Sequence, residues 1–149
     1  MLQTMLKYFD DLTLTELYDV LQLRESVFQI EQNCIYKDID DKDRKCYHLM
    51  LYKEAELVAY CRLVPDGISY DGYASIGRVV SNSNYRKEGY GRQLMAKAME
   101  KMMQVFPHLP IKISAQLYLQ KFYESFGFTV VGEWYMEDDI PHIAMVKKS

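Results

Sequence analysis

The sequence predicts an α+β fold in which a layered, mixed β-sheet is flanked by helices. Helix-like and strand-like segments interleave, in the order helix, three strands, helix, strand, helix and two strands. In addition, the 149 residues contain no low-complexity linker, internal repeat or long block of like charge. We therefore expect residues 1–149 to form a single domain around one main core.

The first predicted helix begins at a capping box. Thr13 precedes an apolar periodic run and Glu16 follows three residues later, so each side chain can bond the backbone N–H of the other residue. The expected apolar face of this helix consists of Leu14, Leu17, Tyr18, Leu21 and Phe28. The pattern predicts a helix that runs to about Glu31 and a loop over the polar, acidic segment 33–45.

Strand-like runs make up much of the remaining chain. They cover residues 47–52, 57–64, 74–80, 111–115, 128–134 and 142–147. The short segment 53–56 between the first two suits a hairpin. Two more helices are expected, one over residues 91–106 and a compact one over residues 117–126 that Gly127 ends.

The composition restricts the function classes. A formal net charge of -3 and a pI near 5.6 argue against sequence-independent nucleic-acid binding, which needs a broad basic surface. No segment approaches the roughly 20 apolar residues of a membrane span, so a cytoplasmic protein is the default expectation. Cys34, Cys46 and Cys61 have no metal-ligand spacing, and their odd number suits a reducing compartment, so we expect no metal site.

A glycine-containing loop before the second helix has the chemistry of a phosphate cradle. The first amides of a helix lack internal acceptors, and the helix dipole adds partial positive charge there. Gly89 and Gly91 allow a ligand to approach the backbone closely, and Arg86, Lys87 and Arg92 add cations. The loop lacks the third glycine of a dinucleotide fingerprint and the Gly-Lys-Ser/Thr of a P-loop. An ordinary capped turn with solvated charges is the alternative.

Aromatic residues gather on the third predicted helix and just after it. We expect Phe122, Phe126 and Phe128 to pack the helix on the sheet. Tyr123 can do the same, but its phenol, with an unperturbed pKa of about 10, can also donate a proton to whatever the loop holds.

These segments together resemble the GNAT superfamily of N-acetyltransferases. The likeness rests on a strand, Arg86-x-x-Gly89-x-Gly91, a helix, and a later strand leading to Phe122-Tyr123-Glu124-Ser125-Phe126-Gly127-Phe128. Residues 23–32, 76–80 and 139–143 are similar to the ElaA-like branch. The resemblance covers nearly the whole chain.

The resemblance implies a splayed sheet with acetyl-CoA as co-substrate between strands 74–80 and 111–115. Backbone groups of Val79 and Val80 would bind the pantetheine arm, and the loop would hold the pyrophosphate. An asparagine common in the family has no match, and Gln116 would take its place. The implied cofactor residues are Val79, Val80, Arg86, Lys87, Glu88, Gly89, Tyr90, Gly91, Arg92 and Gln116.

The reaction implied is transfer of an acetyl group to a primary amine by direct attack in a ternary complex. Tyr123 would act as the general acid toward the leaving thiolate. Glu31, Glu133 and His142 are candidates for the base, although His142 fits a structural hydrogen-bonding role equally well. A covalent relay through a cysteine is the less favoured route, because the sequence shows no motif that would activate one of the three thiols.

The acceptor side is less defined. Arg24 and Arg78 lie within apolar runs, so each must be paired, for example with Glu31 or Glu133, or must bind an acceptor carboxylate. The expected partner is a small-molecule or peptide amine, with no nucleic acid and no membrane, and a homodimer stays open. A non-catalytic acyl-CoA sensor or partner-binding module on the same fold is the alternative, since it needs only the phosphate cradle.

Overall fold

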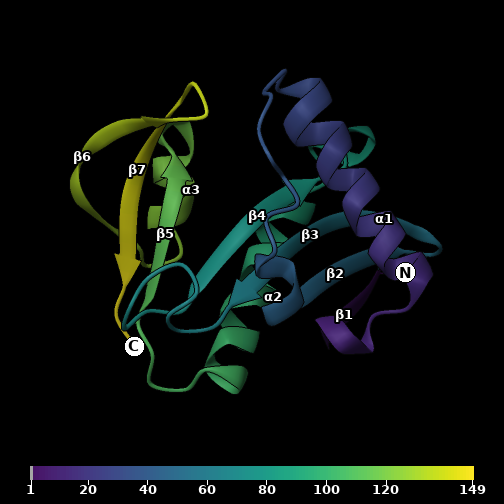
Figure 1. Ribbon diagram of the computed structural model, residues 1–149, viewed down its shortest axis with the longest axis horizontal. Coiled ribbons are helices and arrows are strands. Elements are labelled where there is room, and N and C mark those ends of the chain that lie inside the picture. Colours follow the sequence, from purple (N-terminus) through teal and green to yellow (C-terminus); the bar gives the residue numbers. More distant parts are fainter. Residues whose placement is uncertain (1) are drawn as a thin grey trace.

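The computed structural model describes residues 2–149 and shows an α+β fold with two β-sheets (Figure 1). The first sheet has the antiparallel order β1 (Leu2–Tyr8), β2 (Tyr47–Lys53), β3 (Glu56–Val64) and β4 (Ser75–Ser81). The second has the antiparallel order β5 (Ile111–Gln116), β7 (Ile140–Lys147) and β6 (Thr129–Glu137).

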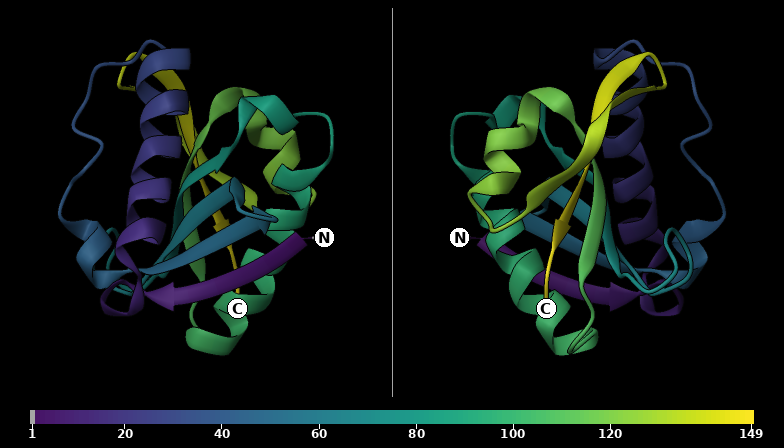
Figure 2. Two further views of the ribbon diagram at one scale, coloured as in Figure 1. Left: turned by 90° about the vertical axis from the view of Figure 1, so that its right-hand side faces the viewer. Right: turned by 90° about the vertical axis from the view of Figure 1, so that its left-hand side faces the viewer.

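Helices cover both faces of this arrangement. Helix α1 (Leu14–Arg24) continues as a π-helical segment over Glu25–Glu31 and lies on one side with the loop that follows it (Figure 2). Helices α2 (Tyr90–Val105) and α3 (Gln120–Glu124) lie on the other side. Across residues 2–149, every helix is too short or too polar to span a lipid bilayer.

The two sheets meet at a parallel bridge between Ala74 and Ile111. There the Ala74 N–H donates to the Pro110 carbonyl over 3.0 Å, and the Lys112 N–H donates to the Ala74 carbonyl over 2.9 Å. Beyond the bridge β4 and β5 belong to separate sheets and diverge (Figure 1). The expected splay between these strands is confirmed.

An apolar core lies on either face of the first sheet. One cluster packs Leu94, Met95 and Ala98 of α2 against β2, β3 and the second sheet. The other packs α1 and the π-helical segment against Met50 and Tyr60. Complete burial of a leucine or methionine side chain contributes about 1.5–3 kcal/mol, so these contacts hold both helix layers on the sheet.

The predicted apolar face of α1 is only partly confirmed, because Phe28 is buried and Leu17 and Leu21 are half-buried, but two of its members face solvent. Leu14 and Tyr18 are 87% and 69% exposed. The side chains that α1 and the following turn bury are Val20, Leu23, Arg24, Val27 and Phe28. Because the buried face includes the charged Arg24, the sequence pattern does not indicate this face as apolar. The start of the helix is as expected, because Thr13 Oγ1 accepts from the Glu16 N–H and Glu16 Oε1 accepts from the Thr13 N–H.

Strand β1 was missed by the sequence analysis. It is an edge strand whose side chains are mostly half-buried, so its sequence lacks a clear apolar alternation. The ion pair between Lys7 and Glu16 joins it to α1 at 2.9 Å. The remaining strands lie within three residues of the predicted ranges, and Gly127 ends α3 with a left-handed φ of +95°.

Candidate active site

A cavity of about 510 Å³ lies where β4 and β5 diverge. Its wall includes residues 76–81 of β4 together with Ile113 and Ser114 of β5. Gly91 and Tyr123 line it from the α2 and α3 side, and Gln32 and Tyr36 line it from the α1 side. Elements from both faces of the sheet therefore contribute residues to the cavity lining.

The N-terminus of α2 opens on this cavity. Gly89 is the N-cap, with a left-handed φ of +79°, and the amides of Tyr90, Gly91 and Arg92 have no acceptor within the helix. Arg86 and Gly91 line the cavity. A Cβ built on Gly91 would meet no atom within 4 Å, so the fold itself leaves room there. Free amides, an open glycine and a guanidinium suit a pyrophosphate.

The other loop residues have different positions. Lys87, Glu88, Gly89, Tyr90 and Arg92 lie outside the cavity lining, although their backbone shapes its edge. The Tyr90 side chain is buried in the core. The Arg92 guanidinium lies 5.4 Å and 5.2 Å from the ring centroids of Phe122 and Phe126. Arg92 therefore joins the start of α2 to the segment around α3.

A β-bulge in β4 shapes the cavity wall. Tyr60 pairs with Val80 and Arg62 pairs with Gly77, so Arg78 and Val79 together stand opposite one residue of β3. Arg78 adopts a left-handed φ of +52°. A bulge leaves backbone groups without ladder partners and redirects side chains. Val79 and Val80 both line the cavity at this point.

Tyr123 lines the cavity from α3 and is 6% exposed. Its ring packs edge-to-face against Phe122 and Phe128, with centroids 5.2 Å and 6.0 Å apart. Burial, with smaller contributions from Cys61 and Tyr118, raises the pKa of the Tyr123 phenol. The phenol is therefore protonated at neutral pH and can donate a proton into the cavity. The predicted packing roles of Phe122, Phe126 and Phe128 agree with their edge-to-face contacts.

His142 lines the cavity from β7, opposite Gln116 of β5 and Tyr135 of β6. Its Nδ1 lies 2.7 Å from the Ile140 carbonyl oxygen, so Nδ1 carries the proton of the neutral ring and donates to that oxygen. Nε2 then presents a lone pair, with Glu137 Oε2 at 3.6 Å.

The histidine at position 48 is different. The His48 Nε2 donates to the Asp43 carbonyl over 2.9 Å, and Nδ1 accepts from the Tyr60 hydroxyl over 2.7 Å. The ring is fully buried, and burial lowers its pKa. Both ring nitrogens are occupied, which agrees with the structural role expected for His48.

Two further predicted residues, Glu31 and Gln116, make side-chain contacts near the cavity. Glu31 forms a two-pronged ion pair with Arg86 and lies outside the cavity lining. Glu133 is exposed on β6 and also lies outside the lining. These positions favour His142 over Glu31 and Glu133 as the base. Gln116 lines the cavity, and its Nε2 donates to Gln32 Oε1 over 3.4 Å.

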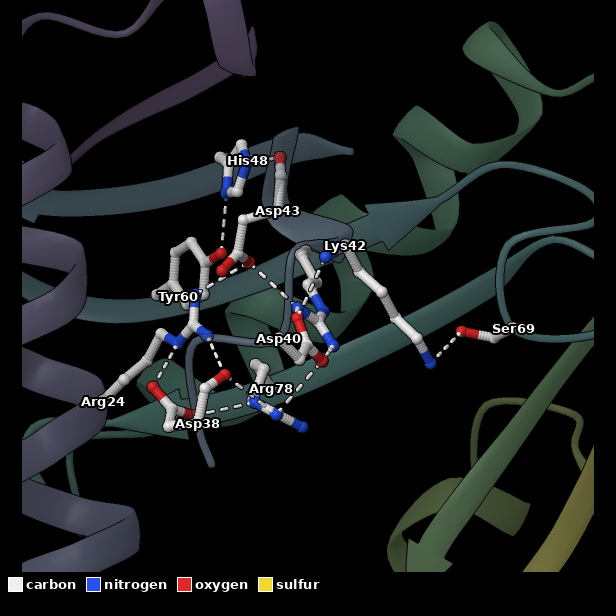
Figure 3. A network of polar contacts seen from close by, with 10 residues as sticks. Arg24, Asp38, Asp40, Lys42, Asp43, His48, Tyr60, Ser69 and Arg78 are labelled. Atoms are coloured by element: carbon white, nitrogen blue, oxygen red, sulfur yellow. Dashed lines mark hydrogen bonds and ion pairs between the residues drawn. The ribbon is translucent and has the colours of Figure 1, made fainter. Parts of the chain in front are cut away.

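An arginine–aspartate cluster is formed by Arg24, Arg62, Arg78, Asp38, Asp40 and Asp43. Figure 3 labels Arg24, Arg78 and the three aspartates. Arg62 and the aspartates were not anticipated from the sequence. Arg24 Nε and NH1 contact Asp38 and Asp43 at 3.0 Å and 2.8 Å. Arg62 contacts Asp40 and Asp43 at 2.7 Å and 2.9 Å. The guanidiniums and carboxylates are equal in number, so their charges balance.

The cluster confirms that Arg24 and Arg78 are paired within the protein, but it corrects their partners and their alternative role in binding an acceptor. Arg24 has no exposed surface and pairs with Asp38 and Asp43, so it neither contacts an acceptor nor pairs with Glu31 or Glu133. Arg78 does line the cavity, but its guanidinium contacts Asp38 at 2.8 Å and Asp40 at 3.3 Å. Burial opposes ionisation of Asp40, but Arg62 and Arg78 outweigh it and hold the Asp40 pKa well below its usual range.

The cysteines stay protonated. Burial raises the pKa of the Cys46 thiol to about 11 and raises the pKa of Cys61 still further. Cys34 does line the cavity, but burial and the nearby Asp138 and Asp139 raise its thiol pKa as well. Its Sγ lies 2.7 Å from the Asp138 carbonyl oxygen, to which it donates. A thiolate nucleophile is therefore disfavoured at each position.

Several cavity residues were not anticipated, among them Ser114, Glu137 and Asp138. Ser114 Oγ donates to Glu137 Oε1 over 3.2 Å and also contacts the Tyr135 hydroxyl. An alternating pattern places Ser114 and Gln116 on one face of β5, and the register places Tyr135, Glu137 and His142 on that same face. The only sequence signal for this wall was that alternation.

The comparisons with known proteins agree with this geometry. The family model described as an acetyltransferase (GNAT) domain matches residues 14–149. The UPF0039 protein of Schizosaccharomyces pombe is 44% identical over 97% of this chain and 95% of its own length. ElaA of Escherichia coli is 42% identical over 95% of this chain and 93% of its own length.

Solved structures show the same likeness. The crystal structure of Escherichia coli ElaA superposes with a TM-score of 0.93 at 40% identity, covering 99% of this chain and 100% of that one. An acyl-CoA N-acyltransferase from Pseudomonas aeruginosa superposes with a TM-score of 0.91 at 44% identity, covering 97% of this chain and 99% of that one.

Proposed function

Since the chain belongs to the GNAT acetyltransferase family and to its ElaA-like group, we propose that it transfers an acetyl group from acetyl-CoA to a primary amine. The observation that carries this proposal is the single cavity between β4 and β5. The N-terminus of α2 opens on it, and Tyr123 and His142 both line it. The similarity to an acyl-CoA N-acyltransferase of Pseudomonas aeruginosa supports the same reaction class.

The cofactor side is formed by α2 and β4. The free amides of residues 90–92 and the Arg86 guanidinium would bind the pyrophosphate. The bulge at Arg78 and Val79 would offer backbone groups to the pantetheine arm, as would Val80. Acetyl-CoA, when bound, supplies an activated acyl group with a thiolate as its leaving group.

The two proton-transfer groups have complementary states. Tyr123 keeps its proton because burial raises its pKa, so it can protonate a departing thiolate. His142 has its proton fixed on Nδ1 by the Ile140 carbonyl, so Nε2 is free to accept a proton from the attacking amine. Holding both reactants in one cavity supplies much of the acceleration.

Transfer proceeds directly rather than through a cysteine. The thiol pKa values are raised at Cys34, Cys46 and Cys61, so no thiolate is available for an acyl-enzyme. Initial-rate plots against the two substrates should therefore intersect. Parallel lines with a burst of free thiol before amine addition would establish a relay.

Release of free thiol from acetyl-CoA in the presence of an amine panel tests the function. We expect amine-dependent release that exceeds simple hydrolysis, and a thermal shift on addition of CoA. If CoA binds but no amine supports release, the non-catalytic acyl-CoA-binding module is the correct reading. If CoA at millimolar concentration gives no shift, both readings fail.

A further inference from the structure

The charged groups of the cavity wall are not balanced. The positive charge of Arg78 is balanced within the arginine–aspartate cluster, and Arg86 is paired with Glu31. The carboxylates of Glu137 and Asp138 line the cavity and have no ion pair with an arginine or lysine anywhere in residues 2–149. The wall opposite the cluster is therefore negative.

Glu137 is held in position by uncharged groups. Ser114 donates to its Oε1 over 3.2 Å, and the Tyr135 hydroxyl in turn contacts Ser114. The Glu137 side chain is still 48% exposed, so its carboxylate keeps free acceptor positions. Asp138 is held through its backbone, because its carbonyl accepts from Cys34.

The buried histidine beside these carboxylates adds a second, independent observation. The His142 side chain is only 9% exposed, and within residues 2–149 its Nε2 makes no hydrogen bond. Nε2 lies 3.6 Å from Oε2 of Glu137, which is also an acceptor, and both residues line the cavity. No group of the described residues donates to Nε2, so a donor can come from the cavity, and an amine is a donor that fits.

We propose that this wall selects an acceptor with two amino groups, which makes the substrate a small diamine or polyamine. One amine would approach Nε2 of His142 and be acetylated, while a second, protonated amine would bind Glu137 and Asp138. An acceptor with a carboxylate in the second place would be repelled by the same wall, and Arg78 has no unbalanced charge to hold it. This assignment rests on the acetyltransferase function proposed above.

Calorimetric titration of the protein saturated with CoA tests the proposal without turnover. The probes are 1,4-diaminobutane, n-butylamine and 4-aminobutyrate, which share a chain length and differ in the second group. We expect the diamine to bind about tenfold or more tighter than the monoamine, since one charge-assisted contact is worth about that factor. Aminobutyrate should bind most weakly. The ratio of kcat/KM values for diamine and monoamine should follow the same order.

Matched variants locate the effect. E137Q should remove most of the diamine preference, whereas E133Q, an exposed neighbour on β6 outside the cavity, should retain it. Equal affinity for diamine and monoamine, stronger binding of aminobutyrate, or an unchanged preference in E137Q would overturn the subsite. Absence of any amine binding would overturn it too. If CoA does not bind, the proposed function fails, and titration of the diamine into the protein alone still decides the subsite.

Discussion

The arginine–aspartate cluster and the wall formed by β5, β6 and β7 both carry charged side chains, but these side chains differ in burial and in their partners, and Glu137 on the wall is 48% exposed. In the cluster each guanidinium meets carboxylates of the same protein at 2.7–3.3 Å, and the charges cancel. On the wall, Glu137 and His142 leave acceptor positions directed at a cavity. Buried charges that cancel within the protein indicate a structural role, whereas a half-exposed carboxylate without a cationic partner on a cavity wall indicates a candidate binding site.

The largest expected effect comes from breaking the cluster. Arg24→Met would leave Asp38 and Asp43 buried with too few cations, so we expect a loss of about 3–5 kcal/mol in the free energy of unfolding. Denaturant titration measures it. The control is Arg44→Met, because Arg44 pairs with Asp41 at 3.4 Å on the surface and should cost less than about 1 kcal/mol. Equal losses in the two variants would show that the cluster is not a structural element.

Removing a proton-transfer group from the cavity should lower the reaction rate instead of the stability. Tyr123→Phe keeps the ring that packs on Phe122 and Phe128 and removes only the phenolic hydroxyl group that donates the proton. We expect kcat to fall by about 100-fold, at the lower end of general acid effects, with CoA affinity nearly unchanged. The measurement is steady-state thiol release, with CoA binding as the control. An unchanged kcat, when chemistry limits the rate, would assign Tyr123 to the core alone.

Substitutions at Gly91 and Gly89 should distinguish an effect on CoA binding from an effect on folding. Gly91→Val adds a side chain where the fold leaves open space, so CoA affinity should drop about tenfold or more while the melting temperature of the free protein changes little. Gly89→Val should also lower stability, because a β-branched residue is strained at the φ of +79°. Normal CoA affinity in Gly91→Val would make the loop an ordinary turn.

The buried His48, which donates to the Asp43 carbonyl beside the cluster, should make stability depend on pH. Because burial lowers its pKa from the ordinary value of 6.5, the folded state binds fewer protons than the unfolded chain below that pH. Stability is thus complete above pH 6.5 and declines as the pH falls, by at most about 1.4 kcal/mol per unit for one group. His48→Gln, which keeps one donor and one acceptor, should flatten the slope just below pH 6.5. Identical slopes would exclude His48.

The structural features that could be predicted from the sequence are those that depend on residues close together in the chain. The capping box at Thr13, the loop from Arg86 to Gly91 and the stop at Gly127 depend on neighbours along the chain. Tyr123 and His142 were selected by residue type and position, and the structure brings both to one cavity.

What the sequence did not predict depends on distant partners. Arg78 and Asp38 are 40 residues apart, and Ser114 and Glu137 are 23 residues apart. No periodic pattern connects such pairs, so neither the cluster nor the acidic wall could be assembled before the sheets were known. The exposed Leu14 and buried Arg24 show the same limit, because a tertiary ion network outweighs helical periodicity.

The smallest expected effect distinguishes Glu31 from His142 as the base. Glu31 pairs with Arg86 at a half-exposed position, so Glu31→Gln should leave stability within about 1 kcal/mol. The variant frees the Arg86 guanidinium, and CoA affinity should therefore rise a few-fold at low salt and return to the wild-type value at high salt.

If His142 is the base, kcat stays nearly constant in this variant, whereas His142→Gln lowers it by about 100-fold. A collapse of kcat in Glu31→Gln, with kcat preserved in His142→Gln, would transfer the proton-accepting role to Glu31. Glu31 lies outside the cavity lining, so as the base it would have to act through a water molecule between its carboxylate and the attacking amine. In that case the solvent isotope effect on kcat should change in Glu31→Gln.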